Sequence, residues 1–345
     1  GGILRHSDCV HVHDAIHRIV AILHSDIVLD RTQEVAKMRF TGRLDSTENT
    51  LRCHASMSVV AAAPAATRNL YLVARVSAGQ AWVMSYETIT YTVEGNVGHL
   101  RLNRPNGANA VSEAFARDLR DVMIEIEFDD AVRAVSVTAE GKVFCAGGDL
   151  KEFHGMGAEL PKHGAKVVGP FHAALYKMNR MTKPFVAGVR GAAGGAGLSL
   201  VGAFDLVISG ESSKYTMAYT RAGMTPDGTS SYFIGRHIGL RRMLDLTLTN
   251  RVLDAATAES WGLVNRVVAD HEVDAATAAM AAELAAGAPF ATGHAKQVIY
   301  NGFEQPLESA GEFEGVMITN AMATADGQEG IASFVEKRSP NWTGK

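Results

Sequence analysis

Two loops of small residues, each directly after an apolar segment, constrain the fold of this chain more than any other feature. The first is FCAGGDL at residues 144–150, and the second is GAAGGAG at residues 191–197. Small side chains let a ligand approach the backbone closely. The second loop also opens a helix, where unpaired N–H groups and the helix dipole favour negative charge. Two such N–H groups directed at one oxygen would form an oxyanion hole. The alternative is that both loops serve only tight turns and close packing.

The remaining pattern predicts an α/β fold. Residues 89–93 and 97–102 alternate as strands around a hairpin turn, and Ser112 is placed to cap a helix that reaches about residue 128. Further strands are expected at residues 134–138, 184–189, 206–208 and 263–267, and further helices at 166–181, 198–203 and over most of the chain beyond 229. This order indicates repeated ββα-type units followed by a helical tail. No GxGxxG motif opens a helix after the first strand, so a dinucleotide site is not indicated.

Composition excludes several classes of protein. The chain has 345 residues, 47% hydrophobic and 20% charged, enough for one large or two modest globular domains. No apolar run reaches the roughly eighteen residues that span a bilayer, so no membrane insertion is expected. The formal net charge is -4 without a long basic cluster, so nucleic acid is not an expected partner. The three cysteines form no CxxC pair, which fits a reducing, cytoplasmic location and predicts no cysteine-based metal site.

Residues 1–83 differ in character from the rest of the chain. They hold six of the thirteen histidines and include an Ala/Pro-rich stretch at residues 61–66, while residues 84–87 (MSYE) resemble an ordinary protein start. We interpret residues 1–83 as a poorly ordered or non-native N-terminal extension. A targeting or accessory segment is the alternative, although the plan of a signal peptide is absent. His13 and His17 could share a helix face and bind a metal, but no carboxylate or thiol spacing supports this.

Five sequence pieces, in order along the chain, resemble the enoyl-CoA hydratase/isomerase (crotonase) superfamily over residues 86–345. They are HLRLNRP at residues 99–105, FCAGGDL at 144–150, GAAGGAGLSLVGAFDL at 191–206, GLVN at 262–265 and FVEKR at 334–338. The resemblance implies a crotonase-like ββα superhelix with residues 84–280 as its core. It also implies a helical C-terminal trimerisation region at residues 281–345, and hence a homotrimer or a dimer of trimers.

The same resemblance implies roles for individual residues. The backbone N–H groups of Gly148 and Ala196 correspond to the family's oxyanion-hole donors, which stabilise the enolate-like oxyanion of a CoA thioester. The expected substrate is therefore an acyl-CoA thioester, with coenzyme A as part of the substrate, no separate cofactor and no metal. The positions that correspond to family contacts with CoA are Arg104, Ala108, Ala146, Gly147, Gly148, Asp149 and Leu150. Gly107 or Ala108 stands where members often carry a lysine, so the chain departs from the family at one phosphate contact.

The chain also departs from the family's hydratases. Those enzymes use two glutamates that flank a water, because one group must activate the water and another must manage the α-proton. Ser199 and Tyr219 stand at the corresponding positions here. Hydration by the two-glutamate route is therefore not expected, whereas Tyr219 is a candidate proton donor or pocket wall.

A carboxylate follows eight residues later, at Asp227, just before a predicted helix. By position alone it would be a helix N-terminal carboxylate that the dipole stabilises. A catalytic aspartate occupies the corresponding place in the dienoyl-CoA isomerases, the ring-epoxide phenylacetyl-CoA isomerase and the 4-chlorobenzoyl-CoA dehalogenase. The resemblance therefore implies that Asp227 is the principal catalytic carboxylate, either as a base in isomerisation or as a nucleophile in dehalogenation.

His172 matches the water-activating histidine of the dehalogenase, although a lone histidine on that helix would more often be a packing residue. Two departures count against dehalogenation: Tyr219 replaces a tryptophan, and Gly148 replaces an aromatic residue. We therefore favour isomerase-type proton transfer by an acyl-CoA enzyme. The alternatives are a hydratase with atypical acid/base residues, an aryl-CoA dehalogenase or hydrolase, and a non-catalytic CoA-binding scaffold. The wall that selects the acyl group is expected within residues 153–170.

Overall fold

The computed structural model describes residues 37–39, 56–58 and 86–345. The chain divides into two compact units, Gly1–Met84 and Ser85–Lys345. In the first unit, β1 (Lys37–Arg39) and β2 (Ser56–Ser58) pair as antiparallel strands. The interpretation of residues 1–83 as an extension, and the alternative that His13 and His17 bind a metal, rest on residues outside the described ranges.

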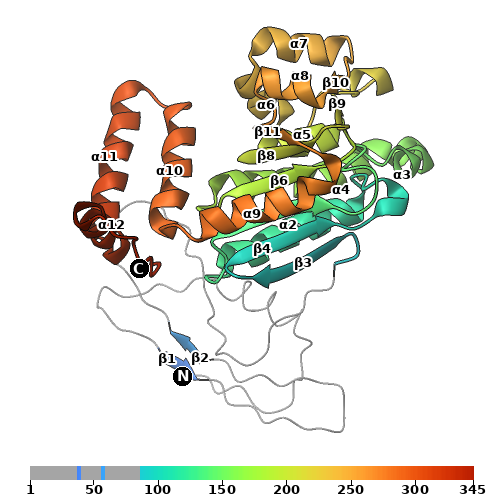
Figure 1. Cartoon of the computed structure of the whole chain (residues 1–345). Coiled ribbons are helices and arrows are strands. Elements are labelled where there is room, and N and C mark those ends of the chain that lie inside the picture. The colour runs from blue at the N-terminus through green and yellow to red at the C-terminus, as the bar shows by residue number, and fades with distance from the viewer. Residues whose placement is uncertain (1–36, 40–55, 59–85) are drawn as a thin grey trace. The chain divides into compact units, whose positions relative to one another are not determined.

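A six-stranded sheet forms the centre of the second unit (Figure 1). Its strands are β3 (Ile89–Glu94), β4 (Val97–Leu102), β5 (Ala134–Ala139), β6 (Phe185–Val189), β8 (Leu206–Gly210) and β11 (Arg266–Val268), in the order β11-β8-β6-β5-β4-β3. Every pair is parallel except the β3–β4 hairpin, whose turn residues Gly95 and Asn96 have positive φ as a tight two-residue turn requires. The last strand begins later than predicted, because the apolar residues Leu263 and Val264 are buried in the loop before it.

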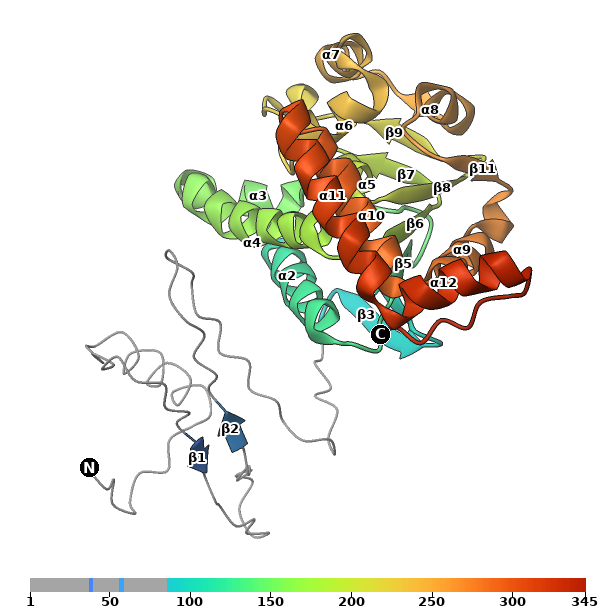
Figure 2. The same ribbon diagram turned by 90° about the vertical axis from the view of Figure 1, so that its left-hand side faces the viewer.

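Helices cover both faces of this sheet. Figure 2 shows α2 (Glu113–Phe128) and α4 (Leu160–Arg180) on one side and α9 (Val273–Ala285) on the other. Alternate strand residues serve the two faces: Phe185 packs with the α2–α4 cluster, whereas Val186 packs with α9. The predicted cap of α2 is confirmed, since the Ser112 hydroxyl accepts a hydrogen bond from the Phe115 amide over 3.1 Å.

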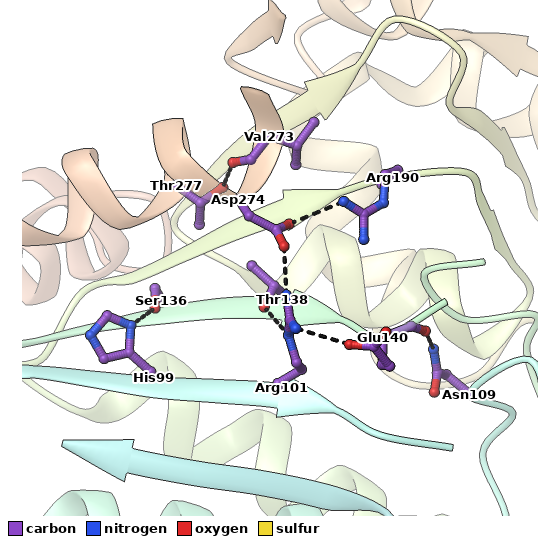
Figure 3. Close-up of polar contacts among 10 residues, drawn as sticks. All are labelled: His99, Arg101, Asn109, Ser136, Thr138, Glu140, Arg190, Val273, Asp274 and Thr277. Carbon is purple, nitrogen blue, oxygen red and sulfur yellow. Dashed lines mark hydrogen bonds and ion pairs between the residues drawn. The ribbon is translucent and has the colours of Figure 1, made fainter. Parts of the chain in front are cut away.

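Charged side chains fasten α9 to the sheet (Figure 3). Arg101 of β4 binds Asp274 in the first turn of α9 over 2.5 Å and Glu140 over 2.9 Å. Arg190 lies 3.6 Å from the other oxygen of Asp274. The N-terminal end of a helix favours a carboxylate such as that of Asp274. The predicted boundary between the core and the C-terminal region, at residue 280, falls inside α9. Because α9 covers the main sheet, the helices that follow the sheet-covering core begin with α10.

A second, three-stranded sheet lies beside the glycine-rich loops. It contains β7 (Ala192–Gly194), β9 (Lys214–Thr216) and β10 (Leu253–Asp254), in the order β10-β9-β7. None of these strands was predicted, because two or three residues are too few to display alternation. Helix α5 (Ala196–Ala203) follows β7 and is buried along its whole length. The second glycine-rich loop is thus both a strand and the start of a buried helix.

The other helices of the second unit complete the chain. They are α3 (Leu150–Gly155), α6 (Ser230–Ile238), α7 (Leu240–Leu248), α8 (Ala255–Trp261), α10 (Pro289–Gly302), α11 (Leu307–Ala323) and α12 (Ala325–Glu336). The helix predicted from residue 166 is longer and begins at Leu160, where Pro161 occupies a first-turn position that needs no amide hydrogen. Among the described residues, no helix is long and apolar enough to cross a membrane.

Candidate active site

The two glycine-rich loops lie against each other. The Gly194 amide donates to the Cys145 carbonyl over 3.0 Å, and the Cys145 amide donates to the Ala192 carbonyl over 3.2 Å. Gly147 has a φ of +108°, and a Cβ at that position would lie 2.8 Å from the Gly194 carbonyl oxygen. Glycine is therefore required at position 147 both by backbone conformation and by the close approach of the second loop.

Each loop presents one of the predicted oxyanion-hole amides. Gly148 is held by hydrogen bonds on both sides of it, from the Val111 amide to the Gly147 carbonyl over 2.7 Å and from the Asp149 amide to the Val111 carbonyl over 3.0 Å. Ala196 is the first residue of α5. Neither the Gly148 nor the Ala196 amide donates a hydrogen bond to any other described residue. Both N–H groups are therefore free to bind an anion, as expected of a helix start and of a small-residue loop.

Both amides belong to one cavity of about 590 Å³. Its walls are mainly apolar and come from the first loop, α3, α4 and the segment before α6; they include Val111, Leu150, Phe153, Leu160, Val167, Phe171 and Met224. The polar side chains in this lining are Tyr219, Thr225 and Asp227. Five residues of the segment 153–170, where the wall that selects the acyl group was predicted, line this cavity: Phe153, Leu160, Gly164, Val167 and Val168. We call this space the acyl cavity.

Of the residues predicted to contact CoA, Ala146, Gly147, Gly148 and Leu150 line the acyl cavity, whereas Arg104, Ala108 and Asp149 do not. The Arg104 guanidinium instead binds the Asp149 carboxylate over 2.7 Å. Burial opposes ionisation of Asp149, but hydrogen bonds from the Glu152 amide and from Arg104 outweigh it, so the pKa of Asp149 lies below its ordinary value. Asp149 also caps α3, and it therefore ties the first loop to the helix that follows.

Asp227 does not act as a cap of the helix that follows it. It precedes Thr229, the residue before α6, and its side chain turns to α4. Its Oδ1 lies 2.8 Å from Nε2 of His172. The Gly228 amide also faces this Nε2, at 3.2 Å. A ring nitrogen carrying a proton donates to the carboxylate, and one without a proton accepts from the amide, so the two contacts compete for the same atom. His172 is thus a partner of Asp227 and not merely a packing residue.

Ser199 and Tyr219 form a buried pair of hydroxyls, 2.9 Å apart. The Ser199 hydroxyl lies 2.8 Å from the Asp227 carbonyl oxygen, and the Tyr219 hydroxyl lies 3.3 Å from the same oxygen. Burial is the main reason that the pKa of Tyr219 is raised above its ordinary value, so the phenol stays protonated at neutral pH. Both hydroxyls therefore act on Asp227 through its backbone. Sequence reasoning treated Ser199 only as a missing carboxylate and did not predict this contact.

A second cavity, of about 690 Å³, also has Asp227 in its lining. Its lining includes Asp227 and His172 together with Tyr176, Asn179, Arg180, Ser231, Gln297, Asn301 and Glu304. It is more polar than the acyl cavity, and we call it the polar cavity. Several of its residues come from α10, which is far from α4 in sequence, so no local pattern predicted them. Within the described residues, no group of three or more His, Cys, Asp or Glu side chains is arranged to hold a metal ion.

Comparison with known proteins identifies the family of this chain. The sequence pattern of the enoyl-CoA hydratase/isomerase family matches residues 92–345. The 1,2-epoxyphenylacetyl-CoA isomerase of Escherichia coli (strain K12) is 32% identical over 260 residues, which cover 75% of this chain and 99% of that protein. The 4-chlorobenzoyl coenzyme A dehalogenase-2 of Arthrobacter sp is 32% identical over 242 residues, which cover 70% of this chain and 88% of that protein. An enoyl-CoA hydratase from Polaromonas sp. JS666 has a crystal structure that matches with a TM-score of 0.71 and 30% identity, over 74% of this chain and 99% of that chain.

The fold and the paired loops define an enzyme of the crotonase superfamily that processes acyl-CoA thioesters. The chain belongs to the enoyl-CoA hydratase/isomerase family, as its sequence motifs predicted. Relatives with isomerase, hydratase and dehalogenase names match at nearly the same identity, so the reaction has to be argued from the residues of this site.

Proposed function

We propose that the protein catalyses isomerase-type proton transfer in an acyl-CoA thioester. The amides of Gly148 and Ala196 would bind the thioester oxygen and stabilise the enolate, since preorganised N–H donors are most effective where negative charge develops. Asp227 would take a proton from the acyl group and return it to another carbon, which moves a double bond. No cofactor beyond the CoA of the substrate is needed for this step.

One observation carries the proposal. Among the residues that the structure describes, Asp227 is the only carboxylate in the lining of the acyl cavity, and Gly148 and Ala196 line the same cavity. A base must lie within reach of the proton that it removes. The Asp227 backbone is held by Ser199 and Tyr219, and its Oδ1 is held by His172, so the orientation of its carboxylate is fixed from two directions. Pre-orientation of this kind lowers the barrier to a proton transfer.

The two-glutamate hydratase mechanism has no support in this cavity. Ser199 is fully buried and its hydroxyl faces backbone carbonyls, and Tyr219 is a phenol, protonated at neutral pH even at its ordinary pKa, which burial raises further. Neither side chain is equipped to remove a proton from water. In a hydration reaction, Asp227 would therefore have to activate the water and also manage the α-proton, the two roles that the two glutamates share in the hydratases.

The test is incubation of the enzyme with a panel of aliphatic and aryl-acetyl CoA thioesters in heavy water, with mass spectrometry of the products. We expect deuterium at the α or γ carbon and a product of unchanged composition otherwise. Asp227→Asn should bind CoA thioesters as the wild type does but lose roughly 10²–10⁴-fold in rate. A 3-hydroxyacyl product containing solvent oxygen would instead identify a hydratase. Unchanged turnover by Asp227→Asn would exclude Asp227 as the base.

The contact between His172 and Asp227 favours a second candidate, hydrolytic dehalogenation of an aryl-CoA. In that reaction Asp227 would attack the ring carbon and expel halide, and His172 would activate the water that hydrolyses the aspartyl ester. The polar cavity beside both residues would supply this water. A single turnover in ¹⁸O-water distinguishes the candidates, because hydrolysis of the ester at its carbonyl places the label in the Asp227 side chain. Halide release from a chlorinated benzoyl-CoA is the complementary measurement.

We also propose that the protein is a homotrimer or a dimer of trimers, assembled through its C-terminal helices. In the second unit, α11 has no buried residue, although Leu307, Ile318 and Met322 project from it. On α12, Phe334 and Val335 are 86% and 75% exposed. Apolar surface of this extent on a single chain indicates a protein–protein interface. Light scattering of the purified protein tests the proposal, and a Phe334→Glu variant should shift the mass toward the monomer.

A further inference from the structure

A buried histidine joins three helices next to the first glycine-rich loop. His163, in the first turns of α4, is 8% exposed. Its Nε2 lies 2.6 Å from Oε1 of Glu152 in α3, and its Nδ1 lies 3.5 Å from Oε2 of Glu113 at the start of α2. The Glu113 amide also donates to Oε1 of Glu152 over 3.1 Å. One imidazole thus faces carboxylates of two different helices, and short hydrogen bonds to carboxylates are among the strong ones.

This cluster is linked to Gly148 through helix α3 and the Phe153 ring. Helix α3 starts two residues after Gly148. None of its side chains is fully buried, and Phe153 is its one hydrophobic side chain that packs against the core, so the contact of Glu152 with His163 adds to a small packed surface. The Phe153 ring occupies the space where a side chain at position 148 would lie, because a Cβ there would be only 2.9 Å from that ring. The same ring meets His163 edge-on, with the ring centroids 6.0 Å apart. The contacts therefore run from His163 through Glu152 and Phe153 to Gly148.

The cluster also borders the acyl cavity. Phe153 of α3, and Leu160, Gly164 and Val167 on both sides of His163 in α4, line that cavity. A shift of α3 relative to α4 would change the shape of this wall and the direction of the Gly148 N–H together. A displacement of about 1 Å at a site of this kind can reduce a rate a hundredfold.

We propose that His163 is a positioning residue, whose contacts with Glu152 and Glu113 set the place of the Gly148 amide and of the Phe153 wall. It touches neither the thioester nor the proton and acts through α3. This inference rests on the proposed function, because it assumes that Gly148 donates to the thioester oxygen. It predicts that loss of the imidazole N–H donor weakens binding of the enolate form of a ligand more than binding of CoA itself.

The test uses acetoacetyl-CoA, whose enolate absorbs in the near ultraviolet and is favoured by donors to its thioester oxygen. His163→Phe keeps a ring against Phe153 but has no N–H group. We expect its enolate-form affinity to fall about tenfold, as for the loss of a hydrogen bond to a charged group, and its affinity for CoA to fall clearly less, by no more than about threefold. Hydrogen exchange of the amides at residues 148–156 should become faster. The exposed His154 at the end of α3 provides the matched control, and His154→Gln should change neither readout.

Glu152→Gln is the milder variant should His163→Phe fold poorly, because it removes one charge and keeps the oxygen that accepts from His163. We expect the same direction of change, about threefold in enolate affinity. The inference would be overturned if a folded His163→Phe variant had the same hydrogen-exchange rates and the same enolate affinity as the wild type. If His163→Phe does not fold, the same result in Glu152→Gln would overturn it. If the wild-type enzyme itself binds acetoacetyl-CoA without forming the enolate, the proposed function fails instead, so the two failures are distinguishable.

Discussion

His172 Nε2 lies 2.8 Å from Oδ1 of Asp227, which joins two residues that are 55 positions apart in the chain. The contact brings α4, which covers the main sheet, to the loop before α6. It occurs at a carboxylate that borders both the acyl cavity and the polar cavity. The Asp227 carboxylate therefore contacts His172 and also faces the acyl cavity, where a substrate could bind.

Loss of that partner should reduce catalysis more than binding. In a His172→Phe variant the Asp227 carboxylate keeps its backbone anchors but loses the group that orients its oxygen. We expect kcat to fall about 10- to 100-fold, with KM changed by less than about threefold, because the interaction orients a reacting group and does not bind CoA. Steady-state kinetics on the best acyl-CoA of the panel supplies the measurement. Tyr176→Phe is the control, since the Tyr176 hydroxyl lies at the marginal distance of 3.4 Å from His172 Nδ1. A His172→Phe enzyme as active as wild type would show that the contact is only structural.

The Ser199 hydroxyl should matter for the same carboxylate through the backbone. Ser199→Ala removes the 2.8 Å contact with the Asp227 carbonyl, and we expect a loss of about 1 kcal/mol in unfolding free energy together with a roughly tenfold lower kcat. Ser213 is a matched control, because it is also fully buried and donates to the Val189 carbonyl over 2.9 Å, outside both cavities. Ser213→Ala should lose similar stability and keep its kcat. Equal kcat values for the two variants would argue against a role for Ser199 in the site.

The lowered pKa of Asp149 predicts a pH-dependent contribution to stability. A carboxyl whose pKa is lower in the folded state stabilises the fold fully above its unfolded pKa, near 4, and loses this effect as the pH falls through the lower folded value. Asp149→Asn keeps an acceptor for the cap of α3 but loses the charge that pairs with Arg104. We expect it to be about 1 kcal/mol less stable than wild type at pH 7, with a smaller difference at pH 3.

Urea unfolding of both proteins at pH 7, 5 and 3 measures this difference. Glu159→Gln is a suitable control, because the Glu159 side chain is 71% exposed and lies near the same helix. A gap between wild type and Asp149→Asn that stays constant down to pH 3 would contradict the linkage.

Local patterns in the sequence predicted the parts of the fold that local forces determine. The β3–β4 hairpin and the Ser112 cap of α2 depend on neighbours within a few residues, and both are present. The strands β7 and β9 depend on pairing between distant segments and are too short to alternate, so no periodicity indicated them. The candidate active site shows the same division between local and long-range determinants. Its amides follow from the glycine-rich loops, whereas the contact of His172 with Asp227 arises only when the sheet and its helices pack.

A buried ion pair attaches α10 to the core and yields the last prediction. Lys296 Nζ lies 2.8 Å from Oδ2 of Asp205, and the two side chains are only 6% and 12% exposed. Burial raises the pKa of Asp205 and lowers that of Lys296, and each charge offsets this effect on the other. Lys296→Met would leave the Asp205 carboxylate buried without its cation, and we expect a loss of about 3–5 kcal/mol in unfolding free energy.

The double variant Asp205→Asn/Lys296→Met should recover much of that loss, because neither side chain then carries an uncompensated charge. Urea unfolding of the wild type, both single variants and the double variant measures the coupling between the two residues. Single variants that each lose less than about 1 kcal/mol, with additive effects in the double variant, would mean that α10 is held by packing alone. A large coupling would instead identify the ion pair as the contact that holds α10, and with it one wall of the polar cavity beside Asp227, in place.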